Sequence, residues 1–186
     1  MAPDVSLRPL EPRDRERLLA WRNSPDIAAW MYSDHRISPE EHERWFAAAL
    51  ADPRRRYWII EAAGRPAGLA NLYDMAPEHG RASWAYYIAD PDLRGQGVGA
   101  FVEYWVIEQV FGTLGFNKLW CEVLIGNAPV WKLHEGFGFC REAHLRQHVR
   151  KNGQPTDVLG LGLLASDWAD RREASAARLR ARGFAI

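Results

Sequence analysis

The clearest candidate for binding an anion is a glycine-rich segment, RGQGVG at residues 94–99. It follows the apolar run ASWAYYIA and precedes apolar residues at helical spacing, so it lies where a strand is expected to become a helix. A helix amino terminus leaves backbone N–H groups without partners and attracts anions. Gly95, Gly97 and Gly99 would let a phosphate group reach them. The spacing fits neither a P-loop nor a dinucleotide fingerprint, and the alternative is a turn needed only for tight packing.

A glutamate interrupts an apolar segment beside the second strand-to-helix junction. Glu122 stands in the middle of LWCEVLI, residues 119–125, and a lone carboxylate is unusual in such an apolar segment. Burial there would favour the neutral carboxyl group and make Glu122 a usable general base. Two structural alternatives stay open: the side chain lies on the solvated face of the sheet, or it pairs with a nearby arginine.

The elements that must position these residues can be read from periodicity and turn signals. Ser38 is expected to cap a helix over residues 38–50, with Glu41 completing a capping box. AAGR predicts the turn of one hairpin, and KNGQ that of another. The expected strands are 5–10, the two arms of 56–74, 82–89, 117–125, 139–150 and 155–164; the expected helices lie within 11–24, 38–50, 98–111, 127–137 and 167–186. This order indicates a mixed sheet with helices on its faces, an α/β or α+β fold.

Composition limits the classes of protein. The 186 residues favour one domain, residues 1–168, followed by a surface helix or tail at 169–186. The 24 basic and 24 acidic residues balance, so we expect no nucleic-acid or membrane partner. No signal-peptide core or run of about 18 apolar residues is present, which predicts a cytoplasmic location. The two cysteines have no metal-like spacing, so no metal site is expected.

The glycine segment resembles the Arg/Gln-x-x-Gly-x-Gly/Ala loop that holds the acetyl-CoA pyrophosphate in the GNAT superfamily of acetyltransferases. A helix led by Asn127 and ending in Gly-Phe follows the next strand, as in that family, and the likeness runs from about Leu7 to Leu164. The resemblance implies a GNAT-like fold, with a mixed, mostly antiparallel sheet of about seven strands and about four helices. It implies acetyl-CoA as co-substrate, bound by Ile88, Arg94, Gly95, Gln96, Gly97, Val98, Gly99, Ala100 and Asn127.

The region before the first hairpin resembles the PseH-type members of the superfamily. They acetylate the 4-amino group of a UDP-linked 4-amino-4,6-dideoxy-N-acetyl sugar in pseudaminic acid biosynthesis. The matching stretch is WRNSPDIAAWMYSDHRISPEEHERWF. The resemblance implies that Arg22 and His42 contact the diphosphate, while the sugar is bound by Met31, Tyr32, Tyr87 and Ile125. Met31 could instead belong to the core, and His42 could be a solvated helix residue. Asp74 is unfavourable near a diphosphate, so either it faces away or the acceptor differs.

The family resemblance also suggests an acid to accompany Glu122 as the base. GNAT enzymes protonate the departing thiolate with a tyrosine in Tyr-Glu-Lys-x-Gly-Phe, and HEGFGF places His134 at that position. Histidine titrates near neutral pH and donates readily to a thiolate. The alternative is that His134 only packs and that water protonates the thiolate. Asn127 is expected to cap the helix or to bind the pantetheine arm.

Other acceptors and one non-enzymatic function stay open at this stage. A protein amino terminus, a polyamine or an antibiotic amine are the alternative acceptors, and a polyamine would need an acidic groove. Residues 20–45 contain several acidic side chains, most of which are explained as helix amino-terminal charges. A catalytically silent acetyl-CoA-binding module is the lesser alternative. The expected partner is a small-molecule amine, and a homodimer is left open.

Overall fold

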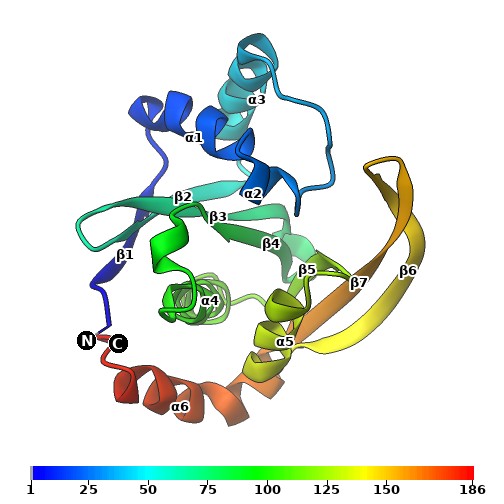
Figure 1. Ribbon diagram of the computed structural model, residues 1–186. Coiled ribbons are helices and arrows are strands. Elements are labelled where there is room, and N and C mark those ends of the chain that lie inside the picture. Colours follow the sequence, from blue (N-terminus) through cyan, green and yellow to red (C-terminus); the bar gives the residue numbers. More distant parts are fainter. Residues whose placement is uncertain (1) are drawn as a thin grey trace.

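Seven strands form one sheet in the order β1-β2-β3-β4-β5-β7-β6 (Figure 1). All neighbours pair antiparallel except β4 and β5, which are parallel. The computed structural model describes residues 2–186. It confirms the expected mixed, mostly antiparallel sheet. The strands are β1 Val5–Pro9, β2 Arg56–Ala62, β3 Arg65–Ala76, β4 Arg81–Ile88, β5 Lys118–Leu124, β6 Cys140–Lys151 and β7 Gln154–Leu164.

Six α-helices flank the sheet, two more than the approximate number expected. They are α1 Arg15–Arg22, α2 Pro25–Ala28, α3 Pro39–Ala51, α4 Val98–Glu108, α5 Ala128–Phe137 and α6 Ala165–Ala181. Figure 1 shows α1 and α3 on one side of the sheet and α4 and α6 on the other. Strand alternation explains this arrangement, because neighbouring residues point to opposite faces. Ile59 packs in the cluster under α1 and α3, whereas Ile60 packs in the core under α4.

The turn and cap signals are confirmed with one exception. Ala63-Gly64 and Asn152-Gly153 have the positive φ angles that tight hairpin turns require. Ser38 caps α3 by accepting a hydrogen bond from the backbone N–H of Glu41 at 3.2 Å. The predicted capping box is wrong in its second half, because the Glu41 carboxylate lies 2.9 Å from His35 Nε2 and not at the Ser38 amide.

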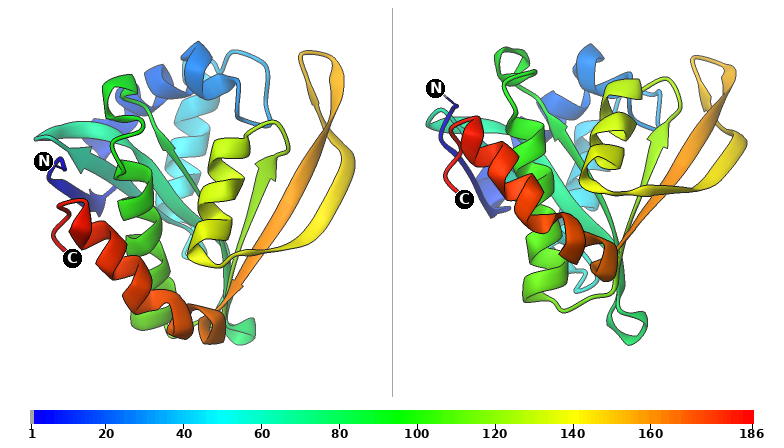
Figure 2. Two further views of the ribbon diagram at one scale, coloured as in Figure 1. Left: turned by 60° about the horizontal axis from the view of Figure 1, so that its bottom comes forward. Right: turned by 90° about the horizontal axis from the view of Figure 1, so that it is seen from below.

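Helix α6 packs against α4 along its length (Figure 2). Trp168, Ala176 and Leu179 of α6 are buried, as is Phe184 after it. The Trp168 indole donates to Glu108 on α4 at 2.8 Å. The boundary expected between residues 168 and 169 falls inside this helix, and the apolar side chains beyond it belong to the main core.

Strands β4 and β5 diverge, and this creates a cleft. Their parallel pairing covers only Arg81 to Ser83 on β4 and Lys118 to Trp120 on β5. Past that point each strand still pairs on its other side, β4 with β3 and β5 with β7. The facing edges of residues 84–88 and 121–124 therefore separate without loss of the sheet, and both segments line a cavity.

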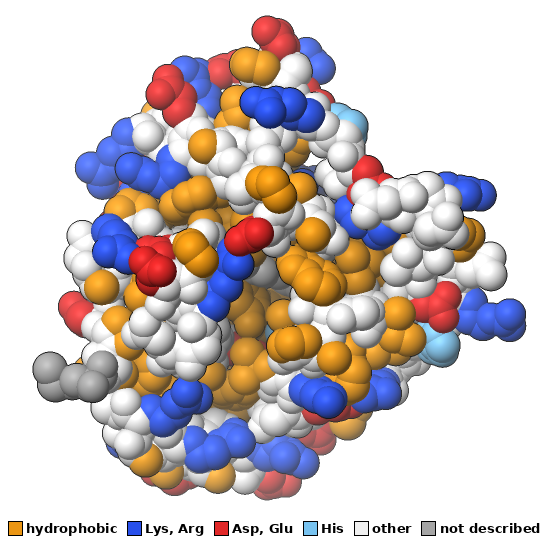
Figure 3. Space-filling view, in the orientation of Figure 1, with side chains coloured by type: hydrophobic (Ala, Val, Ile, Leu, Met, Phe, Trp, Pro, Cys, Tyr) orange, Lys and Arg blue, Asp and Glu red, His pale blue; other side chains and the backbone are white. Residues whose placement is uncertain are grey.

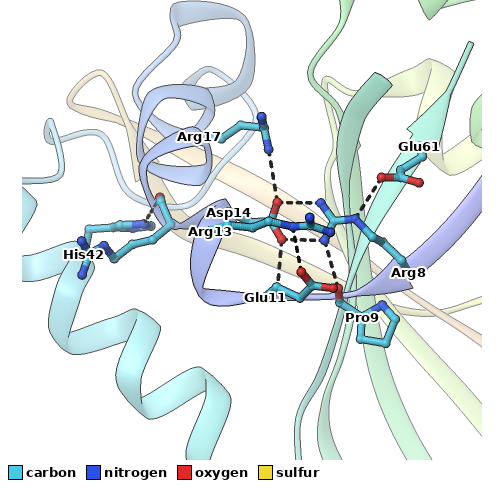
Figure 4. Close-up of polar contacts among 9 residues, drawn as sticks. Arg8, Pro9, Glu11, Arg13, Asp14, Arg17, His42 and Glu61 are labelled. Atoms are coloured by element: carbon cyan, nitrogen blue, oxygen red, sulfur yellow. Dashed lines mark hydrogen bonds and ion pairs between the residues drawn. The ribbon is translucent and has the colours of Figure 1, made fainter. Parts of the chain in front are cut away.

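A buried ion-pair cluster joins β1 to α1, which lies on the face of the sheet opposite α4 (Figure 4). The Asp14 side chain is completely buried and accepts two hydrogen bonds from Arg8, each 2.7 Å long. Arg17 at 3.2 Å and the Glu11 amide at 3.1 Å complete its partners. The cluster holds the start of α1 on the sheet, because every oxygen of the buried carboxylate has a donor.

Candidate active site

The cleft between β4 and β5 has a volume of about 660 Å³. Its walls are the second half of β4, the second half of β5, the glycine loop before α4 and the first turns of α5. Figure 3 shows a hollow lined by apolar side chains, with charged side chains at its rim. A second cavity adjoins it, and Tyr32, Tyr73 and Glu122 line both.

Two glycines of this segment are required by close contacts, and one of them also by its backbone conformation. Gly97 has φ +91°, and a Cβ there would lie 2.9 Å from the Phe184 ring. A Cβ at Gly99 would lie 3.0 Å from the Tyr86 hydroxyl in the cleft. The first amides of α4, beginning at Val98, have no intrahelical acceptor at this end of the helix. The loop therefore serves packing and also leaves room for an anion at those amides.

The Glu122 carboxylate faces the junction of the two cavities. Its Oε2 accepts a hydrogen bond from the Tyr32 hydroxyl at 2.7 Å, and its Oε1 accepts one from the Trp120 indole at 3.4 Å. The side chain is half-buried and lines both cavities. No arginine pairs with it among residues 2–186. A carboxylate held in this way can accept a proton from a group in the cleft.

His134 lines the cleft from α5 and is only 3% exposed. Its Nδ1 lies 2.9 Å from Oε1 of Glu103, a fully buried residue of α4. Trp84 and Phe139 flank the imidazole, each with ring centroids 5.3 Å away. Burial alone would lower the pKa of His134, but the charge of Glu103 and the nearby Cys121 thiol raise this pKa well above its ordinary value.

A model of the acetyltransferase (GNAT) domain matches residues 4–140. The chain belongs to the GNAT family. It is an acetyl-CoA-dependent N-acetyltransferase. The glycine cradle and the free amides of α4 fit the phosphates of that co-substrate.

Several relatives span most of this GNAT chain. The spermidine N(1)-acetyltransferase of Vibrio cholerae is 26% identical over 174 residues, which cover 93% of this chain and 100% of the relative. The spermidine N(1)-acetyltransferase of Escherichia coli is 25% identical over 82% of each chain. The acetyltransferase PseH of Campylobacter jejuni is 26% identical over 68% of this chain and 76% of its own. The sequence likeness to PseH is thus real but covers less of the chain.

The fold also matches solved structures. Vibrio cholerae spermidine N-acetyltransferase in complex with CoA and spermine superposes with a TM-score of 0.82 at 24% identity, covering 89% of this chain and 98% of that one. A dodecameric structure of the same protein gives a TM-score of 0.78. The expected GNAT architecture is confirmed.

Most of the residues expected to hold acetyl-CoA line the cleft of the GNAT domain. Gln96 and Val98 do not: the Gln96 amide donates to the Asp92 carbonyl at 2.6 Å, and Val98 is buried in the core. Asn127 makes no side-chain capping bond, so its amide is free to face the cleft. The remaining residues that line the cleft are Ile88, Arg94, Gly95, Gly97, Gly99 and Ala100.

The residues expected to bind the acceptor are divided between several places. Met31, Tyr32 and Tyr87 line the cleft, while Arg22 lines the second cavity. His42 lines neither of these cavities; its Nε2 lies 2.8 Å from the Arg15 carbonyl (Figure 4). Its ring stacks on Trp45. His42 is buried beside the apolar cluster under α3, where its ring packs against Phe46. Ile125 is exposed and lies outside both linings.

Two residues of the site were not identified from the sequence. Glu103 had a local signal, since it is the one charged residue in the apolar helix segment VGAFVEYWVI. Arg182 had none: it lies after α6, and only the packing of α6 on α4 brings its guanidinium to Gly97 and the cleft. No group of three metal-ligating side chains occurs in the described chain, and no described helix is long and apolar enough to cross a membrane.

Proposed function

We propose that this GNAT enzyme acetylates a polyamine of the spermidine type. The observation that carries the proposal is the extent of the likeness to the Vibrio cholerae spermidine N(1)-acetyltransferase, which covers all of that relative. The UDP-sugar acceptor suggested by the PseH-like segment has support over a shorter stretch. A polyamine was the weaker reading of the sequence alone, and the comparisons favour it.

The composition of the cleft supports a cationic acceptor with an aliphatic backbone. Trp30 and Tyr32 line the cleft and remain 46% and 43% exposed, which is unusual for large aromatic side chains. Aromatic faces attract ammonium groups and also cover methylene chains. Glu122 adds a carboxylate at the inner end of this surface. The acidic groove expected of a polyamine enzyme is thus replaced largely by aromatic side chains.

Glu122 and Tyr32 supply the base in this proposal. An alkylamine is mostly protonated at neutral pH, so a proton must leave before the nitrogen can attack a carbonyl carbon. The Glu122 carboxylate accepts that proton directly or through water. Burial, reinforced by the hydrogen bond to Glu122, raises the pKa of Tyr32, so its hydroxyl stays protonated and orients the carboxylate.

Acetyl-CoA supplies the acetyl thioester on which the amine acts. Gly97, Gly99 and the amides of α4 hold its phosphates in this proposal, and Arg182 adds a cation beside them. His134 gives a proton to the sulfur as the carbon–sulfur bond breaks. Two residues that line the cleft therefore have separate tasks: Glu122 removes a proton from the amine and His134 gives one to the thiolate.

One observation favours a nucleotide-linked amino sugar as the second candidate. Arg22 Nη1 is buried and has no hydrogen-bond partner among the described residues, and Arg22 lines the second cavity with Arg81 and Lys118. An unpartnered guanidinium nitrogen suits a phosphate oxygen and repels a polycation. Asp74 lines the same cavity and opposes an anion there, so the alternative that it faces away is not supported.

Release of CoA thiol from acetyl-CoA tests the function directly. The purified protein is assayed with spermidine, a UDP-4-amino-4,6-dideoxy-N-acetyl sugar, an amino-terminal peptide and an aminoglycoside in separate reactions. We expect turnover with spermidine and a product one acetyl group heavier, with Glu122→Gln losing about a hundredfold or more in kcat. Turnover only with another amine overturns the polyamine proposal. Tight acetyl-CoA binding with no turnover on any amine would indicate the binding module.

Arg22→Gln separates the two leading acceptors. With spermidine, removal of a nearby positive charge should raise kcat/KM or leave it within about twofold. With the nucleotide sugar, loss of a charge-assisted bond to phosphate should lower kcat/KM about tenfold. Arg55→Gln is the matched control, because Arg55 is exposed in the loop just before β2 and is already paired with Asp52.

A further inference from the structure

We propose that Glu103 is the positioning residue that makes His134 a proton donor for the departing CoA thiolate. The proposal rests on the acetyl transfer described above and deepens it. It is carried by a buried carboxylate and an imidazole that meet beneath the cleft, one from α4 and one from α5.

The geometry assigns different tasks to the two ring nitrogens. Nδ1 of His134 is 2.9 Å from Glu103 Oε1, so Nε2 is the nitrogen left to act in the cleft that His134 lines. Aromatic rings of Trp84, Tyr86 and Phe139 surround the imidazole and hold its plane. Glu103 Oε2 has no hydrogen-bond partner among the described residues, so the bond to His134 is the one hydrogen bond of this carboxylate in the described structure.

A histidine needs such a partner to replace a tyrosine. A phenol carries its own proton at neutral pH, whereas an imidazole surrounded by aromatic side chains would be neutral and could not give up its remaining proton. The negative charge of the Glu103 carboxylate favours the positively charged, doubly protonated imidazole instead. Together the pair holds one proton between Oε1 and Nδ1 and another on Nε2, with no net charge, which is why both groups can be fully buried.

The transfer step balances within this pair. As the acceptor nitrogen forms its bond to the acetyl carbon, the carbon–sulfur electron pair stays on sulfur, and the Nε2 proton of His134 moves to that sulfur. The pair then carries one negative charge, centred on Glu103. A proton from water in the open cleft restores Nε2–H before the next turnover. The products are the acetylated amine and CoA thiol.

Cys121 and Tyr86 are the other titratable groups close to the pair in the described structure. Cys121 on β5 lies beside the imidazole and is buried. Tyr86 on β4 has its pKa raised by burial and then by the Glu103 charge, so it is a weaker acid than an ordinary phenol. Burial raises the pKa of Glu103 and the charge of His134 opposes that rise. The protonation state of each group therefore depends on that of the other.

A titration by NMR tests the proposal without any acceptor. In protein with isotopically labelled histidine, the ring nitrogens of His134 should stay protonated through pH 7 and titrate well above 6.5. In Glu103→Gln the midpoint should fall below 6.5, because burial then acts without the carboxylate. A wild-type His134 that is neutral at pH 7, or a midpoint that Glu103→Gln leaves in place, overturns the proposal. If the variant does not fold, the wild-type midpoint decides alone.

The kinetic test uses whichever amine is turned over. Glu103→Gln should lower kcat at pH 8 by about 10- to 100-fold, leave the KM for acetyl-CoA within about threefold, and move the alkaline limb of the kcat profile to lower pH. Glu103→Asp, which keeps a carboxylate, should recover part of the loss. Glu108→Gln removes another carboxylate from α4, one bound to Trp168 and Arg172, and should leave the profile in place.

A double variant separates chemistry from folding. Glu103→Leu with His134→Phe replaces both members of the pair by apolar groups and should be at least as stable as either single change. It should nonetheless stay about as slow as His134→Phe alone. Wild-type kcat in the double variant would show that the pair is structural. If no amine is turned over but the titration midpoint of His134 is raised, the proposed acceptor is rejected. The pairing of Glu103 with His134 is then still supported.

Discussion

Two carboxylates are completely buried among residues 2–186, Asp14 beside β1 and Glu103 on α4, and their surroundings differ. Asp14 accepts hydrogen bonds from Arg8, Arg17 and the Glu11 amide, so the chain supplies all its partners. Glu103 has one hydrogen bond, with His134, and its second oxygen has no hydrogen-bond partner in the described structure. Asp14 lies away from the cleft, whereas His134 lines it.

The difference separates charges that hold the fold from charges kept for a ligand. A buried carboxylate with all of its partners stabilises one geometry, and a proton cannot easily be moved through it. A buried carboxylate coupled to one imidazole has a proton that can move. Arginines show the same contrast: Arg8 is paired with two carboxylates, whereas Arg182 lines the cleft without an ion pair in the described chain.

The largest expected effect is on catalysis at the cleft. His134→Phe should lower kcat by about 100- to 10,000-fold, because general acid catalysis is lost while the ring volume is kept. Asp14→Asn should leave kcat within about twofold below its unfolding temperature. Steady-state kinetics at saturating acetyl-CoA measure both. If the kcat of His134→Phe stayed within threefold of wild type, the proposed difference between a catalytic pair at His134 and a structural pair at Asp14 would be wrong.

The next effect is on stability at the other pair. Asp14→Ala should lower the free energy of unfolding by about 3–5 kcal/mol, because it leaves Arg8 without its main partner in a partly buried setting. Urea denaturation followed by circular dichroism gives the value. Asp52→Ala, which removes a partly exposed carboxylate paired with Arg55, is the control and should change stability much less. A small loss for Asp14→Ala would mean that its cluster is not structural.

The two pairs should also affect stability in opposite pH ranges. Burial would raise the pKa of Asp14, but the bonds from Arg8 lower it overall, so its stabilisation is present above about pH 4 and is lost as the pH falls through the folded value. The pKa of His134 is raised, so its stabilisation is present below about 6.5 and is lost as the pH rises through the folded value.

Urea midpoints between pH 3 and 9.5 measure this difference. Asp14→Asn should flatten the acid side of the stability curve, and His134→Phe should flatten the alkaline side. If both variants flattened the same side, the assignment of opposite protonation behaviour to the two pairs would be wrong.

The smallest effect concerns the unpaired arginine. Arg182→Gln should raise the KM for acetyl-CoA about three- to tenfold with little change in kcat, because one exposed contact to phosphate is worth roughly 1 kcal/mol. Arg180→Gln is the matched control, since Arg180 lies at the same end of α6 and already pairs with Glu173. Equal effects of the two changes would remove the contrast between paired and unpaired arginines.

Local signals predicted the scaffold of the site. The Ala63-Gly64 and Asn152-Gly153 turns, the Ser38 cap and the glycine loop each depend on a few neighbouring residues, and the structure has them where the sequence placed them. His42 was misplaced because its environment is made by α1 and α3 together. Its position on α3 alone does not reveal that the Arg15 carbonyl of α1 lies next to its ring.

The sequence by itself determined the GNAT fold, the glycine loop at one strand-to-helix junction, and the glutamate and the histidine on either side of the other junction. Only the tertiary structure decided which groups meet. The pairs Glu103 with His134, Tyr32 with Glu122, and Arg182 with Gly97 are separated by many residues in the chain, and their contacts depend on helix packing and on the divergence of β4 from β5. Periodicity reports the face on which a residue lies, but the partner on the opposing element is set by long-range packing.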